Sequence, residues 1–166
     1  MLTTYDFCST SGEPGPKRRE GDRQIPEGVY FINHFNPLSN FHLSLGINYP
    51  NASDQILSDK REPGGNIYIH GNCVTIGCIP ITDDKIKELY VLAVEARANG
   101  QTKIPVHIFP SVLNEGGVNQ LRTSFANDLN RTAFWENLST VYSDFEKRKE
   151  LRQIGITKTG HYFFEE

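Results

Sequence analysis

The order of strand-like and helix-like segments predicts an α+β fold around a mixed or mostly antiparallel sheet. Short apolar stretches with the two-residue period of strands come first, and one amphipathic helix follows them. A further strand and then helices rich in aromatic residues complete the chain. The 166 residues suit one domain with a sizeable core better than two domains.

The first half of the chain is expected to form strands separated by polar loops. Residues 3–8 are strand-like and precede a loop rich in Ser, Gly and Pro. Strands are also expected at residues 29–32 and 41–45, on either side of a turn. Residues 48–66 are polar and rich in Asn, Asp, Pro and Gly, so we expect a long loop that acts as a lid or rim.

Residues 83–98 carry the strongest helix signal. Thr82 is a favourable N-cap, and two aspartates follow it where the helix dipole favours negative charge. Gly100 stands where a glycine commonly ends a helix. One apolar stripe recurs at helical spacing and consists of Ile86, Leu89, Tyr90, Ala93 and Val94.

The last third of the chain is expected to be mainly helical. A strand at residues 104–109 is bounded by prolines, and helices are predicted at 119–129 and 132–150. Residues 157–164 are expected to add an edge strand. The buried side of the longer helix is predicted to consist of Phe134, Trp135, Leu138, Val141, Tyr142 and Phe145.

Composition excludes several classes of partner. The net charge is −3, with 17 basic and 20 acidic residues spread along the chain, so no basic stripe suggests nucleic acid or an anionic membrane. No apolar run approaches the roughly 18 residues of a transmembrane helix. The first eight residues lack the basic and apolar regions of a signal peptide.

A histidine and a cysteine lie eight residues apart in the segment 67–78, and they are the strongest indication of chemistry. A strand-like alternation ends at His70, and Gly71 and Gly77 allow a tight return that leads to Cys78. A thiol needs a base to become a thiolate near neutral pH, and imidazole is the usual base. We therefore predict that Cys78 is a nucleophile, that His70 is its general base, and that a nearby imidazolium lowers the pKa of the thiol.

Other interpretations of these residues stay open. Cysteine is among the most buried residue types, so Cys78 could be a core residue. His70, Cys73 and Cys78 could bind zinc, but their spacing matches no common motif and no fourth ligand stands nearby, so no metal or cofactor is predicted. Cys8 can pair with Cys73 only if their Cα atoms lie within roughly 7 Å.

The segment from His70 to Cys78 resembles the active-site motif of the YkuD-type L,D-transpeptidases, in which His-Gly precedes Ser/Thr-x-Gly-Cys. The matching residues are His70, Gly71, Thr75, Gly77 and Cys78. The resemblance extends over about residues 5–150 to the YafK-like branch of the family. It is carried by Gly15-Pro16-Lys17, Glu20-Gly21-Asp22-Arg23-Gln24, Pro26-Glu27-Gly28 and Phe134-Trp135-Glu136-Asn137-Leu138, among other segments.

This resemblance implies a catalytic domain of the β-sandwich type with mixed sheets and one helix after the cysteine. The whole chain, 1–166, would be that single domain, and residues 112–166 would be a C-terminal helical extension packed on it. The chain begins inside the domain of the family, so the first N-terminal strands are expected to be missing. The second histidine of the wider family is replaced by Ile76, as in the YafK-like branch, so the mechanism would depend on His70.

The resemblance also implies roles for single residues. The Cys78 thiolate would attack a diaminopimelate carbonyl to form a thioester, and His70 would carry the proton. The main-chain carbonyl of Gly71 would orient the imidazole. Backbone N–H groups at Gly77 and Cys78 would stabilise the oxyanion.

Four further residues are predicted to bind substrate. Arg23 and Lys17, together with Arg18, suit the substrate carboxylates, although a solvated surface charge is the alternative for each of them. Thr75 would bond either the substrate or the cysteine loop.

The function implied is a cysteine-dependent L,D-transpeptidase that acts on peptidoglycan stem peptides. If water resolves the thioester, the activity is instead that of an L,D-amidase or hydrolase that releases a protein or peptide, such as a wall-linked lipoprotein. A non-catalytic wall-binding module is a further alternative, against which the intact His70 and Cys78 argue. The resemblance implies the periplasm or cell envelope as the location.

Overall fold

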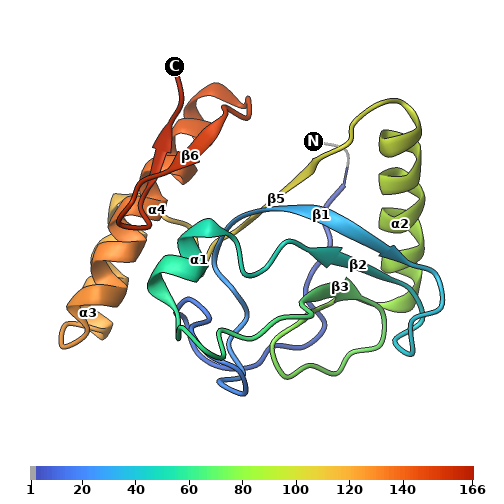
Figure 1. Cartoon of the computed structure of the whole chain (residues 1–166), viewed down its shortest axis with the longest axis horizontal. Helices are drawn as coiled ribbons and strands as arrows, with labels where there is room; N and C mark the ends of the chain where they lie inside the picture. Colours follow the sequence, from blue (N-terminus) through green and yellow to red (C-terminus); the bar gives the residue numbers. More distant parts are fainter. Residues whose placement is uncertain (1–2) are drawn as a thin grey trace.

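The computed structural model describes residues 3–166, and its architecture is α+β with mixed sheets, as the sequence predicts (Figure 1). Within these residues, the larger sheet has the strand order β4-β3-β2-β1-β5, and only its β3–β4 pair is parallel. The strands are β1 (Gly28–Asn36), β2 (Ser44–Ile47), β3 (Tyr68–His70), β4 (Ile79–Pro80) and β5 (Ile104–Ile108). The smaller sheet pairs β6 (Ile154–Ile156) with β7 (Tyr162–Phe164). The helices are α1 (Ala52–Leu57), α2 (Asp83–Ala98), α3 (Glu115–Ser124) and α4 (Leu129–Arg148).

Helix α2 forms over the predicted residues and covers one face of the larger sheet. Ile86 and Ala93 are buried in the core beneath it, with further residues of the predicted stripe packed alongside. Thr82 stands at the N-cap position, but its hydroxyl makes no capping hydrogen bond. Gly100 follows the end of the helix with φ +93°, the left-handed conformation expected of a terminating glycine.

Two predicted strands in the N-terminal half need correction. Residues 3–8 form no strand, and the Cys8 N–H donates an isolated hydrogen bond to the Pro80 carbonyl at 3.1 Å. The strand expected at 41–45 begins only at residue 44, because the chain is still turning before it. His42 has φ +75°, a left-handed conformation that interrupts a strand.

The predicted loop 48–66 contains a short helix, α1. The Asn51 side chain accepts a hydrogen bond from the Asp54 N–H, and the Asp54 carboxylate accepts one from the Asn51 N–H. This reciprocal capping box starts a helix of six residues. The prediction failed because so short a helix shows no apolar periodicity.

The C-terminal elements are present with shifted bounds. The helices predicted at 119–129 and 132–150 both begin earlier, because the side chains of Asn114 and Asp128 cap their first turns. The single edge strand predicted at 157–164 is instead a hairpin of β6 and β7. The predicted apolar side of α4 is confirmed for its buried residues Phe134, Trp135, Leu138 and Val141.

A β-bulge in β1 decides which side chains reach the core. The register shifts between Ile32 and His34, so that Asn33 is an extra residue on this strand. Ile32 and Phe35 therefore both face the core under α2, although they are three residues apart. His34 lies on the opposite side of the sheet, which we call the open face.

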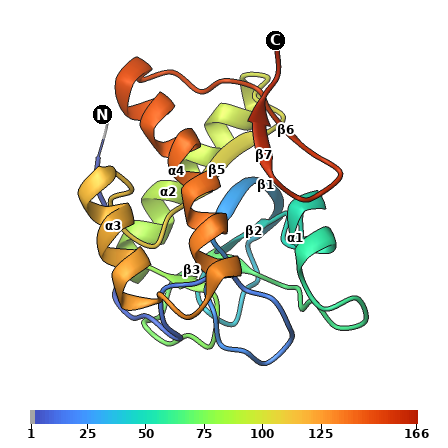
Figure 2. The ribbon, with the colours of Figure 1, turned by 90° about the vertical axis from the view of Figure 1, so that its left-hand side faces the viewer.

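Two cores lie side by side in the molecule. The sheet unit, residues 3–111, buries one core between the larger sheet and α2. The C-terminal unit, residues 112–166, buries a second core among α3, α4 and the hairpin. Figures 1 and 2 show this unit at the end of the sheet away from α2. No helix within residues 3–166 is long and apolar enough to cross a membrane.

Polar groups are buried at the seam between the two units. The Trp135 Nε1–H donates to the Glu27 carboxylate at 2.7 Å, and the Gly15 N–H donates to the same carboxylate at 2.6 Å. The nearby Asp54 carboxylate accepts a hydrogen bond from the Tyr30 hydroxyl. Burial raises the pKa of Glu27 to about 7 and that of Asp54 to about 6, against the effect of these donors.

Candidate active site

The β3–β4 pair places His70 and Cys78 at adjacent strands of the sheet. Ile69 is opposite Ile79 in the parallel register, and both side chains are buried in the core. Because side chains alternate along a strand, His70 lies on the open face, and Cys78 directly precedes Ile79 on the neighbouring strand.

The His70 imidazole is held in a defined orientation. Its Nδ1 lies 2.5 Å from the Gly71 carbonyl oxygen, and because a carbonyl only accepts, Nδ1 must carry the proton. The Nε2 atom then has a free lone pair, as a general base requires. The ring is only 2% exposed, and the Phe41 ring lies over it at 4.8 Å between centroids.

Cys78 is a half-buried free thiol at the start of β4. Its sulfhydryl points toward the Asn66 carbonyl, with 3.7 Å between Sγ and the oxygen. Burial raises the pKa of the thiol, while the Tyr68 backbone and the Lys17 charge act in the opposite direction. The expected lowering of this pKa by an imidazolium is therefore wrong for the resting structure, in which no hydrogen bond joins Sγ to His70 among the residues described.

The loop before Cys78 is closed by Thr75. Its hydroxyl donates to the Cys78 carbonyl at 2.8 Å and accepts from the Gly77 N–H at 3.1 Å. A hydrogen bond donated by Thr75 to the substrate, or oxyanion binding by the Gly77 N–H, would require one of these bonds to be given up. The Cys78 N–H is the better oxyanion donor, because none of the hydrogen bonds found in residues 3–166 uses it.

Gly77 is also required by the shape of the loop. It has φ +141°, and a Cβ added to it would lie 3.1 Å from the Gln24 carbonyl oxygen. The backbone of Arg23 and Gln24 therefore forms a wall against which the cysteine loop packs. A side chain at position 77 would push this wall and Cys78 apart.

The three predicted cations differ in their surroundings. Lys17 is only 3% exposed, and its ammonium pairs with Asp22 at 2.7 Å, so the surface-charge alternative is wrong for this residue. Arg23 is exposed beside the cysteine loop, and its guanidinium has no ion-pair partner in the described part of the chain. Arg18 points elsewhere, with its guanidinium over the Phe134 ring.

A disulfide joins Cys8 to Cys73, with 5.3 Å between their Cα atoms. It links the N-terminal segment to the loop between His70 and Cys78. Cys73 is therefore unavailable as a thiolate ligand, which removes the zinc alternative. Cys78 remains the one free cysteine, as the nucleophile prediction needs.

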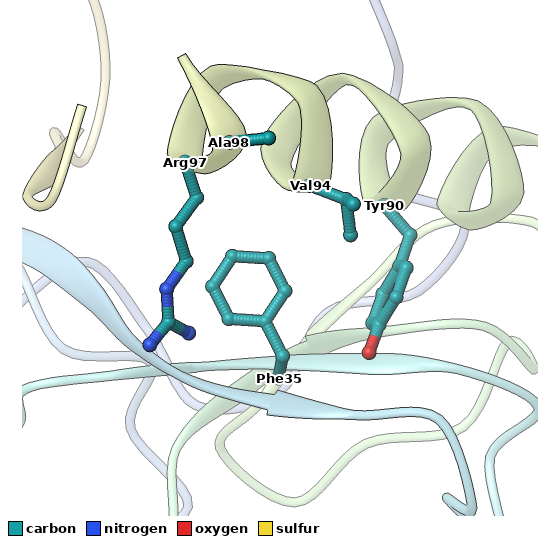
Figure 3. Close-up of a pocket in the computed structure, with 5 residues that line it drawn as sticks. All are labelled: Phe35, Tyr90, Val94, Arg97 and Ala98. Carbon is teal, nitrogen blue, oxygen red and sulfur yellow. The ribbon is translucent and has the colours of Figure 1, made fainter. Parts of the chain in front are cut away.

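A shallow apolar pocket lies on the other side of the sheet from His70. It is formed where α2 crosses β1 and holds the Phe35 ring between Arg97 and Tyr90 (Figure 3). Because Phe35 faces the core under α2 and His70 faces the open side, this pocket is not part of the candidate active site.

Sequence reasoning missed three contributors to the site. Phe41, expected to belong to a strand face, instead covers His70. The Asn66 carbonyl, which accepts from Cys78, comes from the segment expected to be a lid or rim. Asp83, expected only to favour the helix dipole, accepts a hydrogen bond from the Asn72 N–H at 2.7 Å. The run Gly64-Gly65-Asn66 directly before β3 was an available signal for the second of these.

Comparisons with known proteins agree with the motif. The family model of the L,D-transpeptidase catalytic domain, YkuD, matches residues 2–108. The chain is 32% identical over 164 residues to the protein named "Putative L,D-transpeptidase YafK" of Escherichia coli K12, and the same figures hold for that of strain O157:H7. These matches cover 98% of this chain and 63% of the relatives, so the chain spans less than two thirds of their length.

Among solved structures, the helical cell shape determining protein Pgp2 from Campylobacter jejuni is similar, with 20% identity and a TM-score of 0.45. The likeness covers 89% of this chain and 62% of that one. A K307A mutant of the same protein gives a TM-score of 0.46 at 19% identity.

Proposed function

Because the chain belongs to the YkuD family of L,D-transpeptidase catalytic domains, we propose that it is a cysteine-dependent acyltransferase acting on peptidoglycan stem peptides. One observation carries the proposal. Cys78 directly precedes β4, the strand that pairs with the His70 strand β3, and the imidazole is held so that Nε2 is free to accept a proton. A structural cysteine or a core histidine would not need this arrangement.

The proposed reaction has two halves. Cys78 Sγ attacks the carbonyl of a diaminopimelate residue while its proton passes to His70 Nε2, and the Cys78 N–H stabilises the oxyanion. The C–N bond then breaks, and the His70 proton leaves with the amine, which gives a thioester. An acceptor amine attacks the thioester to form a new amide and restores the thiol.

Burial raises the pKa of the Cys78 thiol, which fits transfer of the Sγ proton to His70 during the attack itself. Arg23 is the best placed of the three predicted cations for a substrate carboxylate, because Lys17 is already paired with Asp22 and Arg18 lies over the Phe134 ring. We therefore propose that Lys17 acts mainly through its charge near Cys78, and that Arg23 binds the substrate.

Water could replace the amine in the second half and would make the protein an L,D-amidase or hydrolase. The acceptor is not defined by the residues around Cys78. The location proposed is the periplasm or cell envelope, where peptidoglycan lies. The Cys8–Cys73 disulfide supports this, since such bonds persist in oxidising compartments.

Mass spectrometry of digested sacculi after incubation with the protein tests the proposal. New cross-links would identify a transpeptidase, and released peptide or protein would identify a hydrolase. His70→Ala should abolish either change, whereas His34→Ala, which alters a histidine on the same face bonded only to Tyr68, should not. Unchanged sacculi with the wild-type protein would overturn the proposal.

A further inference from the structure

The peptide group between Gly71 and Asn72 is hydrogen-bonded at both ends. Its carbonyl oxygen lies 2.5 Å from His70 Nδ1. Its N–H donates to Asp83 Oδ1 at 2.7 Å. The carbonyl and the N–H belong to one planar, delocalised unit, so His70 and Asp83 lie at opposite ends of the same peptide bond.

Local structure around this peptide suits the arrangement. A Cβ added to Gly71 would lie 2.6 Å from Asp83 Oδ1, so only glycine lets the carboxylate come this close. Asn72 has φ +58°, a left-handed conformation that asparagine tolerates better than most residues. Asp83 is the first residue of α2, and its carboxylate is turned to the loop.

We propose that Asp83 is a positioning residue for His70 and acts on it through the Gly71–Asn72 peptide. Its negative charge polarises the peptide and makes the Gly71 carbonyl a stronger acceptor for the imidazole. This keeps the proton on Nδ1 and leaves Nε2 free for Cys78. When His70 takes the thiol proton, the Asp83 carboxylate stabilises the imidazolium from the other end of the Gly71–Asn72 peptide.

The arrangement resembles a nucleophile, base and carboxylate in series, with a peptide group inserted before the carboxylate. Asp83 is exposed, so solvent screens its charge and its effect should be moderate. The inference rests on the proposed function, because it gives His70 a partner for the role of base.

The neighbouring Asp84 provides a matched control. It carries the same charge in the same first turn of α2, but its carboxylate is 92% exposed and, within residues 3–166, its one ion pair is with Lys87. Asp83→Asn removes the charge and keeps an acceptor oxygen, and Asp83→Ala removes both. Asp84→Asn changes the net charge, and the charge near the start of the helix, by the same amount as Asp83→Asn, but it does not affect a contact with the Gly71–Asn72 peptide.

Nitrogen-15 NMR of the His70 ring reports its tautomer without any substrate. Asp83→Ala should move part of the neutral population from the Nδ1–H to the Nε2–H tautomer, with a smaller change in Asp83→Asn and none in Asp84→Asn. Turnover of sacculi should fall about tenfold in Asp83→Ala at unchanged KM, as for one partly exposed charge-assisted hydrogen bond.

Two results would overturn the inference. One is an Asp83→Ala spectrum identical to wild type in a variant whose thermal midpoint shows that it is folded. The other is an Asp84→Asn variant that shifts the tautomer as much as Asp83→Asn. If the wild-type protein does not process sacculi, the proposed function fails while the NMR comparison still decides whether Asp83 sets the tautomer.

Discussion

Two regions of the molecule, the candidate active site and the seam between the two units, hold their polar groups in opposite ways. In the sheet unit, His70 and Cys78 each contact a backbone carbonyl at the end of a strand or loop. At the seam with the C-terminal unit, the Glu27 and Asp54 carboxylates are buried. Backbone acceptors fix the direction of a side chain whatever the pH, whereas buried carboxylates lose or gain a charge near neutrality. We therefore expect the reactivity of Cys78 and the stability of the fold to be separable. Reactivity would depend on the strand ends around His70 and Cys78, and stability on the C-terminal core.

Replacing the predicted nucleophile should have the largest effect on turnover and should separate activity from stability most clearly. Cys78→Ala is expected to reduce turnover at least about a thousandfold, because no thioester can form. Its thermal midpoint should stay close to that of the wild type, because a small, half-buried side chain is removed. Sacculus digestion and differential scanning fluorimetry measure the two quantities. A variant that keeps its activity and loses its stability would show instead that Cys78 is a structural cysteine.

The Cys8–Cys73 disulfide is the feature that should affect both properties together. Its partners are 65 residues apart in sequence, so Cys8→Ser with Cys73→Ser should lower the free energy of unfolding by about 4 kcal/mol or less. The loop between His70 and Cys78 should also loosen, which would change the rate at which iodoacetamide alkylates Cys78. Reduced wild-type protein is the control and should behave like the double variant. An unchanged alkylation rate in both would mean that the bond only stabilises the fold.

A cavity in the C-terminal core should affect stability alone. Leu138 is fully buried there, so Leu138→Ala is expected to cost about 3 kcal/mol of unfolding free energy. At temperatures below its lowered thermal midpoint, the folded variant should show the same alkylation rate of Cys78 as the wild type. Leu129→Ala, at a site that is 76% exposed on the same helix, is the control and should be close to neutral. If Leu138→Ala alters the reactivity of Cys78, the two units are coupled.

The pH dependence of stability should reveal the buried carboxylates. The folded-state pKa of Glu27, about 7, lies above its ordinary value of 4.5, so the folded protein binds the extra proton. The contribution of Glu27 to the free energy of unfolding is fully present below about pH 4.5 and is lost as the pH rises through 7. The contribution of Asp54 is lost in the same way as the pH rises through about 6. Chemical denaturation between pH 5 and 8 should therefore show falling stability.

Glu27→Gln should flatten this slope, although the variant should be less stable because an amide cannot accept from both Trp135 and Gly15. Glu13→Gln, at an exposed carboxylate, should leave the slope unchanged. An identical slope in Glu27→Gln and the wild type would exclude Glu27 as the titrating group.

Much of the fold could be predicted because its signals are local. The stripe and flanking residues of α2 identified that helix, and alternation before His70 identified β3. The helix α1 was missed because side chains of two polar residues, Asn51 and Asp54, start it. The earlier starts of α3 and α4 likewise depend on single capping side chains, which apolar periodicity does not report.

The candidate site was likewise predicted only in part. The motif located His70 and Cys78, but the partners that orient them come from segments distant in sequence. Phe41 reaches His70 through the pairing of β2 with β3, and Asn66 reaches Cys78 from the end of a long connection. The raised pKa of Cys78 follows from burial, which neither the motif nor its spacing reveals.

The bulge in β1 has a consequence for how the length of this strand can vary. Between Ile32 and Asn36, Asn33 is the residue that β2 does not match, so a chain without it would keep Ile32 and Phe35 on the core side and His34 on the open side. Loss of His34 would have the same result with Asn33 on the open side, whereas loss of Ile32 would remove a core residue. Single-residue deletions in β1 among related sequences should therefore concentrate at positions 33 and 34.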